Sequence, residues 1–346
     1  MKFSFKRATA GVAAVAALTL VLSGCADTGP AEGGGDGEGS GSSEISITLL
    51  PKNLGNPYFD ASRVGAEAAA ADLGAEFEEV GPTEATPDGQ VSYINTAAQQ
   101  QRSALVVSAN DPNAICDALN EASDAGVKIV TFDSDTNPEC RDLFINQADT
   151  EGIARVQGDL IADQIGGAGE VAILSASANA TNQNAWNDAF EEYVASEYPD
   201  ITVVETVYGD DDDQTSFDKT AALLQTYPDL KGIVSPTTVG IAAAARYLSD
   251  SDAKGKVALT GLGTPNQMRE YIEDGTVTAF ALWNPEDLGT LATYAAAALV
   301  NGDITGAEGD TFDAGDLGTF TVGADGVVLL GDPFEFNADN IGDFDF

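Results

Sequence analysis

Short apolar runs that do not alternate with polar residues recur along the chain, and segments with helical spacing separate them. The first run covers residues 45–50, and the helical segment after it covers 58–73 and ends at Gly74. The remaining runs lie at 76–80, 104–108 and 128–132, and then in a second series at 170–174, 202–207, 232–234, 257–260 and 278–282. Runs of this kind separated by helices predict parallel strands that are covered on both faces. We therefore expect an α/β protein with two doubly wound parallel-sheet lobes joined by a hinge.

The two series divide the chain into two lobes that exchange segments. Residues 44–147 and 284–318 are expected to form the N-terminal lobe, and residues 148–283 and 319–346 the C-terminal lobe. The connecting segments, about which the lobes would close, are expected near 145–148, 283–285 and 317–319.

The charge balance excludes several functions. The chain has 15 Lys and Arg residues against 56 Asp and Glu residues, a net charge of −41, and no His. A field of this sign repels nucleic acids and anionic lipid surfaces, because affinity for phosphates comes from Lys and Arg. Without imidazole there is no Ser-His or Cys-His couple and no His-ligated metal. We predict no nucleic-acid partner, no metal and no cofactor.

The N-terminus has the layout of an export signal. Lys2, Lys6 and Arg7 precede an apolar run over 8–22, and Leu22-Ser23-Gly24-Cys25 follows. This tetrapeptide resembles the bacterial lipobox, which implies a signal segment over 1–25 and a lipid on Cys25 that holds the protein on the extracytoplasmic face of the cell membrane. An ordinary cleaved signal is the alternative. Residues 26–43 are almost entirely Gly, Ser, Asp and Glu, and they predict a flexible linker.

Two cysteines remain for the folded part. Cys116 lies in a helical segment over 112–125, for which Asp111 and Pro112 supply a cap and a first turn, and Cys140 lies in the loop after the fourth strand. An even pair in an oxidising compartment predicts a disulfide. The alternatives are two buried free thiols and, with less support because no His can activate it, a catalytic thiol.

Polar and aromatic residues follow nearly every predicted strand. In open parallel sheets, ligands bind beyond the carboxyl ends of the strands. The segments at these positions are 51–59, 109–112, 133–135, 181–184, 235–238, 261–264 and 283–285. They supply amides, hydroxyls, carboxylates and aromatic rings. Such a set suits a neutral polyhydroxylated ligand, whose hydroxyls both donate and accept while flat rings cover its C–H face.

At these residues the chain resembles a known family, the ABC-transporter sugar-binding lipoproteins of the periplasmic-binding-protein-like class I. The resemblance is carried by an ordered set of motifs: Lys-Asn-Leu-Gly-Asn-Pro-Tyr-Phe (52–59), Val-Ser-Ala-Asn-Asp-Pro (107–112), Asp-Ser-Asp (133–135), Ile-Asn-Gln-Ala-Asp (145–149), Thr-Asn-Gln-Asn-Ala-Trp (181–186), Pro-Thr-Thr-Val-Gly-Ile (236–241) and Ala-Leu-Trp-Asn-Pro (281–285). Within the class, the chain is similar to rhamnose-binding proteins and to receptors for the quorum signal autoinducer-2. The resemblance implies a sugar ligand, a membrane permease as partner, and a monomer.

The autoinducer-2 receptors imply a specific set of ligand contacts. In this chain they correspond to Lys52, Asp133, Asn182 with Gln183, Pro236 and Thr238. Asn182 stands where a carboxylate is expected, and Thr238 stands where a small apolar residue is expected. Both departures resemble the rhamnose-binding pattern. We therefore place rhamnose or a similar deoxyhexose first and autoinducer-2 second.

The candidate ligand-binding residues are Lys52, Asn53, Tyr58, Phe59, Asp133, Asp135, Asn182, Gln183, Pro236, Thr238 and Trp283. Several have structural alternatives. Lys52 could be a surface lysine, Asp133 and Asp135 could cap the next element, and Trp283 could be a core residue. Trp186 is expected in the core. The acidic run 210–213 lacks the Gly and the distal Glu of a calcium loop, so we expect a solvated loop at the rim of the cleft.

Three function classes follow. The first is a solute receptor, not an enzyme, whose lobes close on a sugar. The second is a glycosidase that uses Asp133 with a partner carboxylate, but the opposite wall offers Asn182, Gln183 and Thr238 instead of an acid. The third is a sensor that passes its signal to a membrane kinase.

Overall fold

The computed structural model describes residues 45–346. The predicted signal segment 1–25 with its lipidation site Cys25, and the predicted linker 26–43, lie outside the described residues. Within residues 45–346, no helix is both long enough and apolar enough to cross a membrane.

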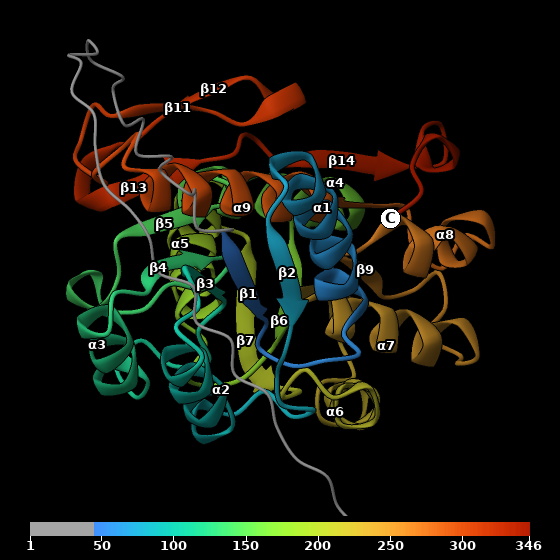
Figure 1. The fold of residues 1–346 in the computed structure, drawn as a ribbon. Helices are drawn as coiled ribbons and strands as arrows, with labels where there is room; N and C mark the ends of the chain where they lie inside the picture. The colour runs from blue at the N-terminus through green and yellow to red at the C-terminus, as the bar shows by residue number, and fades with distance from the viewer. Residues whose placement is uncertain (1–44) are drawn as a thin grey trace, which may run out of the picture. The chain divides into compact units, whose positions relative to one another are not determined.

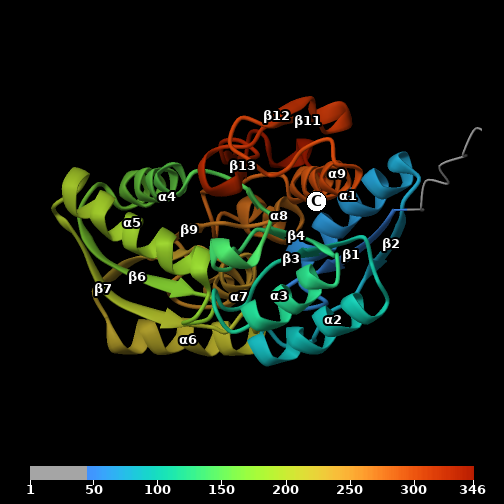
Figure 2. The same cartoon turned by 60° about the vertical axis from the view of Figure 1, so that its left-hand side comes forward.

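The N-terminal lobe is built on a parallel sheet of six strands in the order β13-β5-β4-β3-β1-β2. The strands are β1 (Ser46–Leu50), β2 (Glu76–Glu79), β3 (Ala104–Val107), β4 (Lys128–Phe132), β5 (Leu143–Asn146) and β13 (Val327–Leu329). Helices α1 (Pro57–Leu73) and α9 (Pro285–Asn301) cover one face, and α2 (Pro87–Gln99) and α3 (Cys116–Asp124) cover the other (Figures 1 and 2). All four residues of β3 are buried, as expected for a strand covered on both faces.

The C-terminal lobe repeats this plan. Its parallel sheet has the order β7-β6-β8-β9, with strands β6 (Gly169–Ser175), β7 (Ile201–Tyr208), β8 (Leu230–Ser235) and β9 (Ala258–Gly261). A bridge between Leu262 and Ala281 connects it to β10 (Ala279–Leu282), which pairs antiparallel with β14 (Phe334–Asn337). Helices α4 (Thr150–Ile165) and α5 (Thr181–Glu197) cover one face, and α6 (Asp213–Thr226) and α7 (Thr238–Ser249) the other (Figure 2). Helix α8 (Pro265–Glu273) packs beside α7.

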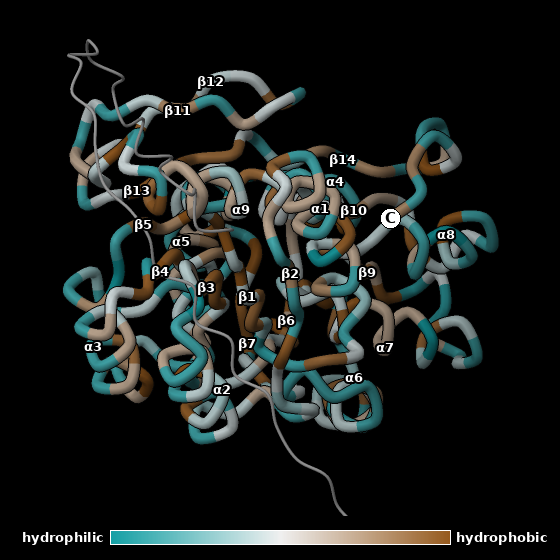
Figure 3. The backbone as a smooth tube through the Cα atoms, in the orientation of Figure 1, coloured by the Kyte–Doolittle hydropathy of each residue, from teal (hydrophilic) through white to brown (hydrophobic). Residues whose placement is uncertain are grey.

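Hydropathy follows these layers. The hydrophobic segments coincide with the central strands, whereas the covering helices and the loops carry the hydrophilic residues (Figure 3). The nine predicted strands are all present, and α1 ends at Gly74 in the left-handed conformation, with φ of 65°. The predicted α/β fold with two parallel sheets is confirmed.

The chain passes between the lobes at residues 147–149, 283–284 and 330–333. The third passage lies later than the expected segment 317–319, because β13 pairs in parallel with β5 of the N-terminal sheet. A hairpin of β11 (Thr311–Asp313) and β12 (Thr319–Thr321) precedes β13, and β11 packs against α9. The boundary expected at 318 and 319 is therefore wrong. A strand of three residues is too short to stand out as an apolar run.

The predicted start of α3 at Pro112 is also wrong. Asp111 Oδ1 accepts hydrogen bonds of 2.8 Å from the backbone N–H groups of Asn113 and Ala114, so the cap closes a turn, and the helix begins only at Cys116.

Cys116 is joined by a disulfide to Cys140 at the end of a short 3₁₀ helix, η1 (Pro138–Cys140). The bond ties α3 to the loop between β4 and β5. The chain also has 3₁₀ turns η2 (Gly315–Leu317), η3 (Ala324–Gly326) and η4 (Ile341–Asp343).

Helices α1 and α9 approach each other unusually closely. A Cβ atom on Gly65 of α1 would lie 1.9 Å from the Glu286 carbonyl oxygen, and a Cβ atom on Gly289 of α9 would lie 1.9 Å from the Ser62 carbonyl oxygen. Only glycine fits at these two positions. Because α1 follows the loop after β1 and α9 follows the passage at 283–284, this contact positions two segments that border the pocket described next.

Candidate functional site

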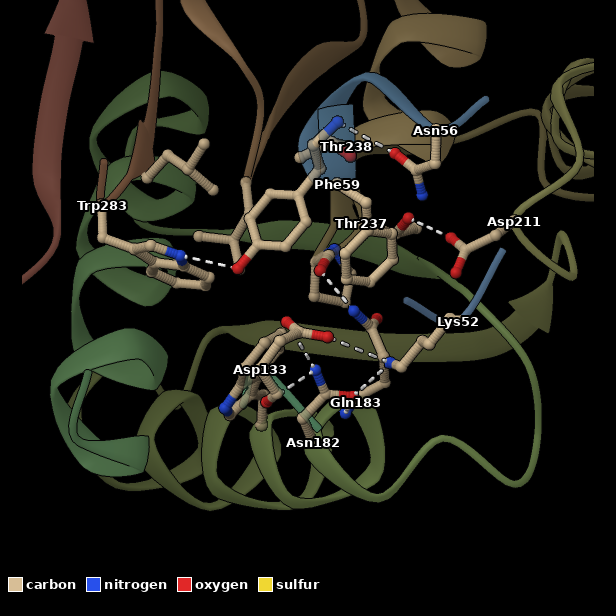
Figure 4. Close-up of a pocket in the computed structure, with 15 residues that line it drawn as sticks. Lys52, Asn56, Phe59, Asp133, Asn182, Gln183, Asp211, Thr237, Thr238 and Trp283 are labelled. Atoms are coloured by element: carbon tan, nitrogen blue, oxygen red, sulfur yellow. Dashed lines mark hydrogen bonds and ion pairs between the residues drawn. The ribbon is translucent and has the colours of Figure 1, made fainter. Parts of the chain in front are cut away.

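A pocket lies between the lobes, at the carboxyl ends of the strands of both sheets (Figure 4). The lining residues are Lys52, Asn56, Tyr58, Phe59, Asp133, Asn182, Gln183, Trp186, Asp211, Pro236, Thr237, Thr238, Leu262, Leu282 and Trp283. Nine of the eleven candidate residues from the sequence line it. The other two, Asn53 and Asp135, do not.

Lys52 connects the two walls of the pocket. Lys52 is the second residue after β1, and its side chain is only 4% exposed. The alternative of a surface lysine is therefore wrong. Lys52 Nζ donates a hydrogen bond of 3.0 Å to Asn182 Oδ1 and lies 3.6 Å from Asp133 Oδ2. Asn182 belongs to the opposite lobe, so this bond exists only while the lobes are together.

Asp133 is held by several partners. It follows β4 with a φ of 59°, a left-handed conformation that is uncommon for a residue with a side chain and recurs at functional sites. Its Oδ2 accepts from Ser108 Oγ at 2.7 Å and its Oδ1 from Asn182 Nδ2 at 3.3 Å. Together with the Lys52 ion pair, these contacts engage both carboxylate oxygens. Asp133 therefore orients Lys52 and Asn182.

Asn182 and Gln183 lie in the first turn of α5. Asn182 places its oxygen on Lys52 and its N–H₂ group on Asp133, so an amide fits where a carboxylate would face Asp133 without a donor. Gln183 Nε2 donates to the Pro236 carbonyl oxygen at 2.6 Å, and its Oε1 accepts from Ser175 Oγ at 3.2 Å. These bonds connect the ends of β6 and β8. The polar side of the pocket is thus a hydrogen-bonded network that spans both lobes.

Aromatic residues form another side of the pocket. The ring centroid of Trp283 lies 6.2 Å from that of Tyr58 and 5.7 Å from that of Trp186, and both pairs meet edge to face. Trp283 Nε1 donates to the Tyr58 hydroxyl oxygen at 2.9 Å. Burial, and then the nearby charge of Asp133, raise the pKa of Tyr58 well above its ordinary value. Tyr58 therefore keeps its proton, and its oxygen accepts from Trp283 while the Asp133 carboxylate lies near its O–H group.

Some of these aromatic residues were assigned to the core from the sequence. Trp186 lines the pocket and is also 4% exposed, so it packs and borders the site at once. Trp283 is likewise buried, 3% exposed, and lines the pocket. The alternatives of core residue and pocket residue do not exclude each other here, because the pocket wall is itself part of the core.

Five further lining residues were not selected from the sequence. They are Asn56, Asp211, Thr237, Leu262 and Leu282. Three of them, Asn56, Thr237 and Leu262, lie in segments that follow predicted strands, so the strand-end rule located the segments but not the individual side chains. Leu282 is the last residue of β10.

Asp211 comes from the acidic run that we expected at the rim of the cleft. Its Oδ1 accepts a hydrogen bond from Thr237 Oγ1, and the side chain lines the pocket (Figure 4). Burial raises the pKa of Asp211, and the charge of Lys52 and the bond from Thr237 counteract this increase only in part.

Asn53 and Asp135 take other positions. Asp135 accepts hydrogen bonds from Arg141 Nε at 2.7 Å and Arg141 Nη2 at 2.8 Å, a bidentate ion pair outside the pocket. Its role is therefore structural, as an ion-pair partner of Arg141 and not as the helix cap that was its alternative. Asn53 lines a second cavity, together with residues 83–86 and 210–212.

Among residues 45–346, no three Asp, Glu, Cys or His side chains converge closely enough to hold a metal ion. The acidic run 210–213 instead caps α6, where Asp212 Oδ1 accepts from the Thr215 backbone N–H at 2.7 Å.

Comparison with known proteins identifies the family. Residues 47–304 match the periplasmic binding protein domain family. A sugar ABC transporter structure from Actinomyces odontolyticus is 55% identical, with a TM-score of 0.72 over 87% of this chain and 98% of that chain. An ABC transporter solute-binding protein from Clostridium phytofermentas with bound L-rhamnose is 39% identical, with a TM-score of 0.84 over 87% of this chain and 98% of that one. LsrB from Clostridium saccharobutylicum in complex with AI-2 is 26% identical, with a TM-score of 0.83 over 87% and 100% of the two chains. The chain therefore belongs to the periplasmic binding protein family.

Proposed function

We propose that this chain is the extracytoplasmic substrate-binding protein of an ABC sugar importer and that it binds a neutral monosaccharide, L-rhamnose first, in the pocket between the lobes. In this proposal Cys25 carries the lipid that anchors the protein to the cell membrane, and the closed, sugar-loaded lobes dock as a monomer on a membrane permease. The sugar leaves unaltered, because the chain acts as a receptor and not as an enzyme.

The observation that carries the proposal is the pairing of charges in a pocket formed by both lobes. Lys52 is already engaged by Asp133 and Asn182, so it offers little to an anionic ligand. Amide, hydroxyl and carboxylate groups surround it, and these match sugar hydroxyls, which both donate and accept. The bond from Lys52 to Asn182 joins the lobes, so a ligand that strengthens this network would favour closure.

The apolar lining favours a deoxyhexose over a fully hydroxylated sugar. Leu262, Leu282 and Trp283 lie together in the pocket and offer no acceptor to a hydroxyl group. The methyl group of a 6-deoxy sugar needs no hydrogen-bond partner there. A hydroxyl group would remain without a partner, which would cost about 1 to 3 kcal/mol of binding free energy. The similarity to the L-rhamnose-bound structure supports the same choice.

Autoinducer-2 is the second candidate. Lys52, Asp133, Gln183 and Pro236 occupy the pocket at the positions that the autoinducer-2 receptors imply, and the AI-2 complex superposes on this chain with a TM-score of 0.83. Asn182 and Thr238 argue against it, because an amide replaces the carboxylate of the receptor pattern and a hydroxyl-bearing side chain replaces a small apolar one.

Titration calorimetry of the purified protein tests the proposal. The panel contains L-rhamnose, L-fucose, D-ribose, D-arabinose and autoinducer-2. We expect micromolar or tighter binding of L-rhamnose by the wild type, loss of that binding in Asp133→Ala, and wild-type affinity in Asp252→Asn, an exposed carboxylate outside the pocket. Tightest binding of autoinducer-2 would reassign the ligand. Binding of no sugar, or hydrolysis of a glycoside, would refute the proposal.

A further inference from the structure

Asp133 and Asp211, the two carboxylates that line the pocket, differ in whether an oxygen atom remains free to accept a hydrogen bond from a ligand. Both oxygens of Asp133 are engaged, by Ser108, Asn182 and Lys52. Asp211 accepts only from Thr237, through Oδ1, and its Oδ2 has no hydrogen-bond partner among residues 45–346 (Figure 4). Thr237 itself lines the pocket, and its hydroxyl hydrogen is directed to Asp211. Asp211 is therefore the carboxylate with an acceptor available to a ligand.

The loop that carries Asp211 is held in an unfavourable backbone conformation. Asp210 has a φ of 55° and Asp211 a φ of 50°, both left-handed and neither a glycine. Asp212 fixes the end of this loop, because its Oδ1 accepts from both the N–H and the hydroxyl of Thr215 at 2.7 Å. Two consecutive non-glycine residues in the left-handed region cost free energy. Such a conformation persists where the surrounding structure imposes it, as at binding sites.

A second cavity adjoins the pocket at Asp211. Residues of both lobes line it: Asn53 and 83–86 from the N-terminal lobe, and 210–212 from the C-terminal lobe. Four carboxylates lie in this lining, at Glu84, Asp210, Asp211 and Asp212, and the lining contains no Lys or Arg. Asn53 is only 8% exposed, and its Oδ1 has no partner within the described residues. The cavity therefore offers acceptors and negative charge from both lobes.

We propose that Asp211 accepts a hydrogen bond from a ligand hydroxyl and that the acidic cavity beside it makes the cleft discriminate against anionic sugars. This inference rests on the proposed function, because it concerns the sugar that the pocket would bind. A ligand carboxylate or phosphate near Asp211 would face four like charges, and the pocket's cation, Lys52, is already paired. A neutral sugar meets no such repulsion and gains the open acceptor of Asp211.

Calorimetry with a matched pair of ligands tests this inference. The pair is L-rhamnose and L-mannuronate, which carries a carboxylate in place of the rhamnose methyl group; if another sugar of the panel binds best, that sugar and its uronate replace them. We expect Asp211→Asn to weaken binding of the neutral sugar at least about tenfold. The control Asp252→Asn, which also removes one negative charge, should stay within about twofold of the wild type.

The double variant Glu84→Gln/Asp210→Asn tests the acidic cavity. We expect the ratio of uronate to neutral-sugar affinity to rise at least about fivefold at low salt, and the increase to shrink at high salt, because screening weakens charge repulsion. Thermal unfolding separates ligand contact from misfolding, since Asp211→Asn should melt no lower than the wild type. Affinity of Asp211→Asn within twofold of the wild type, or an unchanged ratio in the double variant, overturns this inference alone. A wild type that binds no sugar refutes the proposed function and this inference with it.

Discussion

Gly289→Ala tests whether the close contact of α1 and α9 is needed for stability. The added methyl group would lie 1.9 Å from the Ser62 carbonyl oxygen and 2.8 Å from its carbon. Real Cβ atoms essentially never come closer than 3.0 Å to another heavy atom, so the helices must separate by about 1.1 Å. Both groups at the contact are backbone, so no flexible side chain can move aside.

The magnitude follows from the helix interface. Ala66, Ala69, Leu288 and Ala292 are buried on these two helices. A gap of this size forfeits up to about half of the dispersion attraction along such a surface, and overpacking typically costs about 1 to 3 kcal/mol. Alanine returns about 1 kcal/mol through its higher helix propensity. Because no side chain can move aside, we expect the steric cost to lie at the upper end of this range and the net loss to be about 2 kcal/mol, which lowers Tm by about 4 °C.

Thermal unfolding followed by circular dichroism provides the assay. Gly152→Ala is the matched control, because a Cβ atom there meets its nearest neighbour at 3.7 Å, an ordinary contact, and the same propensity gain should leave Tm unchanged or raise it slightly. If Gly289→Ala melts at or above the wild-type temperature, the steric argument from the α1 and α9 contact is refuted.

Three further predictions concern the pocket and the disulfide. Because burial raises the pKa of Asp211, the unfolded chain releases this proton at lower pH than the folded protein does, and the free energy of unfolding falls as pH rises between the two pKa values. Asp211→Asn should therefore raise Tm at neutral pH. In melts across a pH series, the difference from the wild type should vanish below about pH 3.5. Trp283→Phe removes the donor to the Tyr58 hydroxyl and should cost about 0.5 to 1.5 kcal/mol in stability, seen in urea unfolding; an unchanged midpoint would show that the bond contributes nothing. Cys140→Ser should lose about 3 kcal/mol, and reductant should lower the Tm of the wild type but not of the variant.

Prediction from the sequence succeeded where the signal was local and periodic. Strand β3 is apolar throughout, and α1 ends at Gly74, whose left-handed backbone conformation is typical of the residue after a helix. The segments near the pocket were found for a topological reason, since the carboxyl ends of parallel strands meet at one edge. The prediction missed five strands of three or four residues, β5, β11, β12, β13 and β14, whose apolar pattern is too short to stand out.

Individual side chains were harder to assign than segments. Asp133 and Asp135 are two residues apart and equivalent in the sequence, yet Arg141 binds Asp135 outside the pocket, while the left-handed backbone at Asp133 places that carboxylate beside Lys52. Asp211 is one of four consecutive aspartates, and only its contact with Thr237 distinguishes it.

The alternation of nine strands with helices, the two parallel sheets and the segments at their ligand-facing edges were determined by the sequence alone, because hydrophobic periodicity and short right-handed connections are local properties of the chain. Only the tertiary structure decided which lobe β13 joins, which carboxylates are engaged and which acceptor stays open. Those outcomes depend on contacts between residues far apart in the chain, such as the hydrogen bond from Lys52 to Asn182 across 130 positions, and no local pattern encodes them.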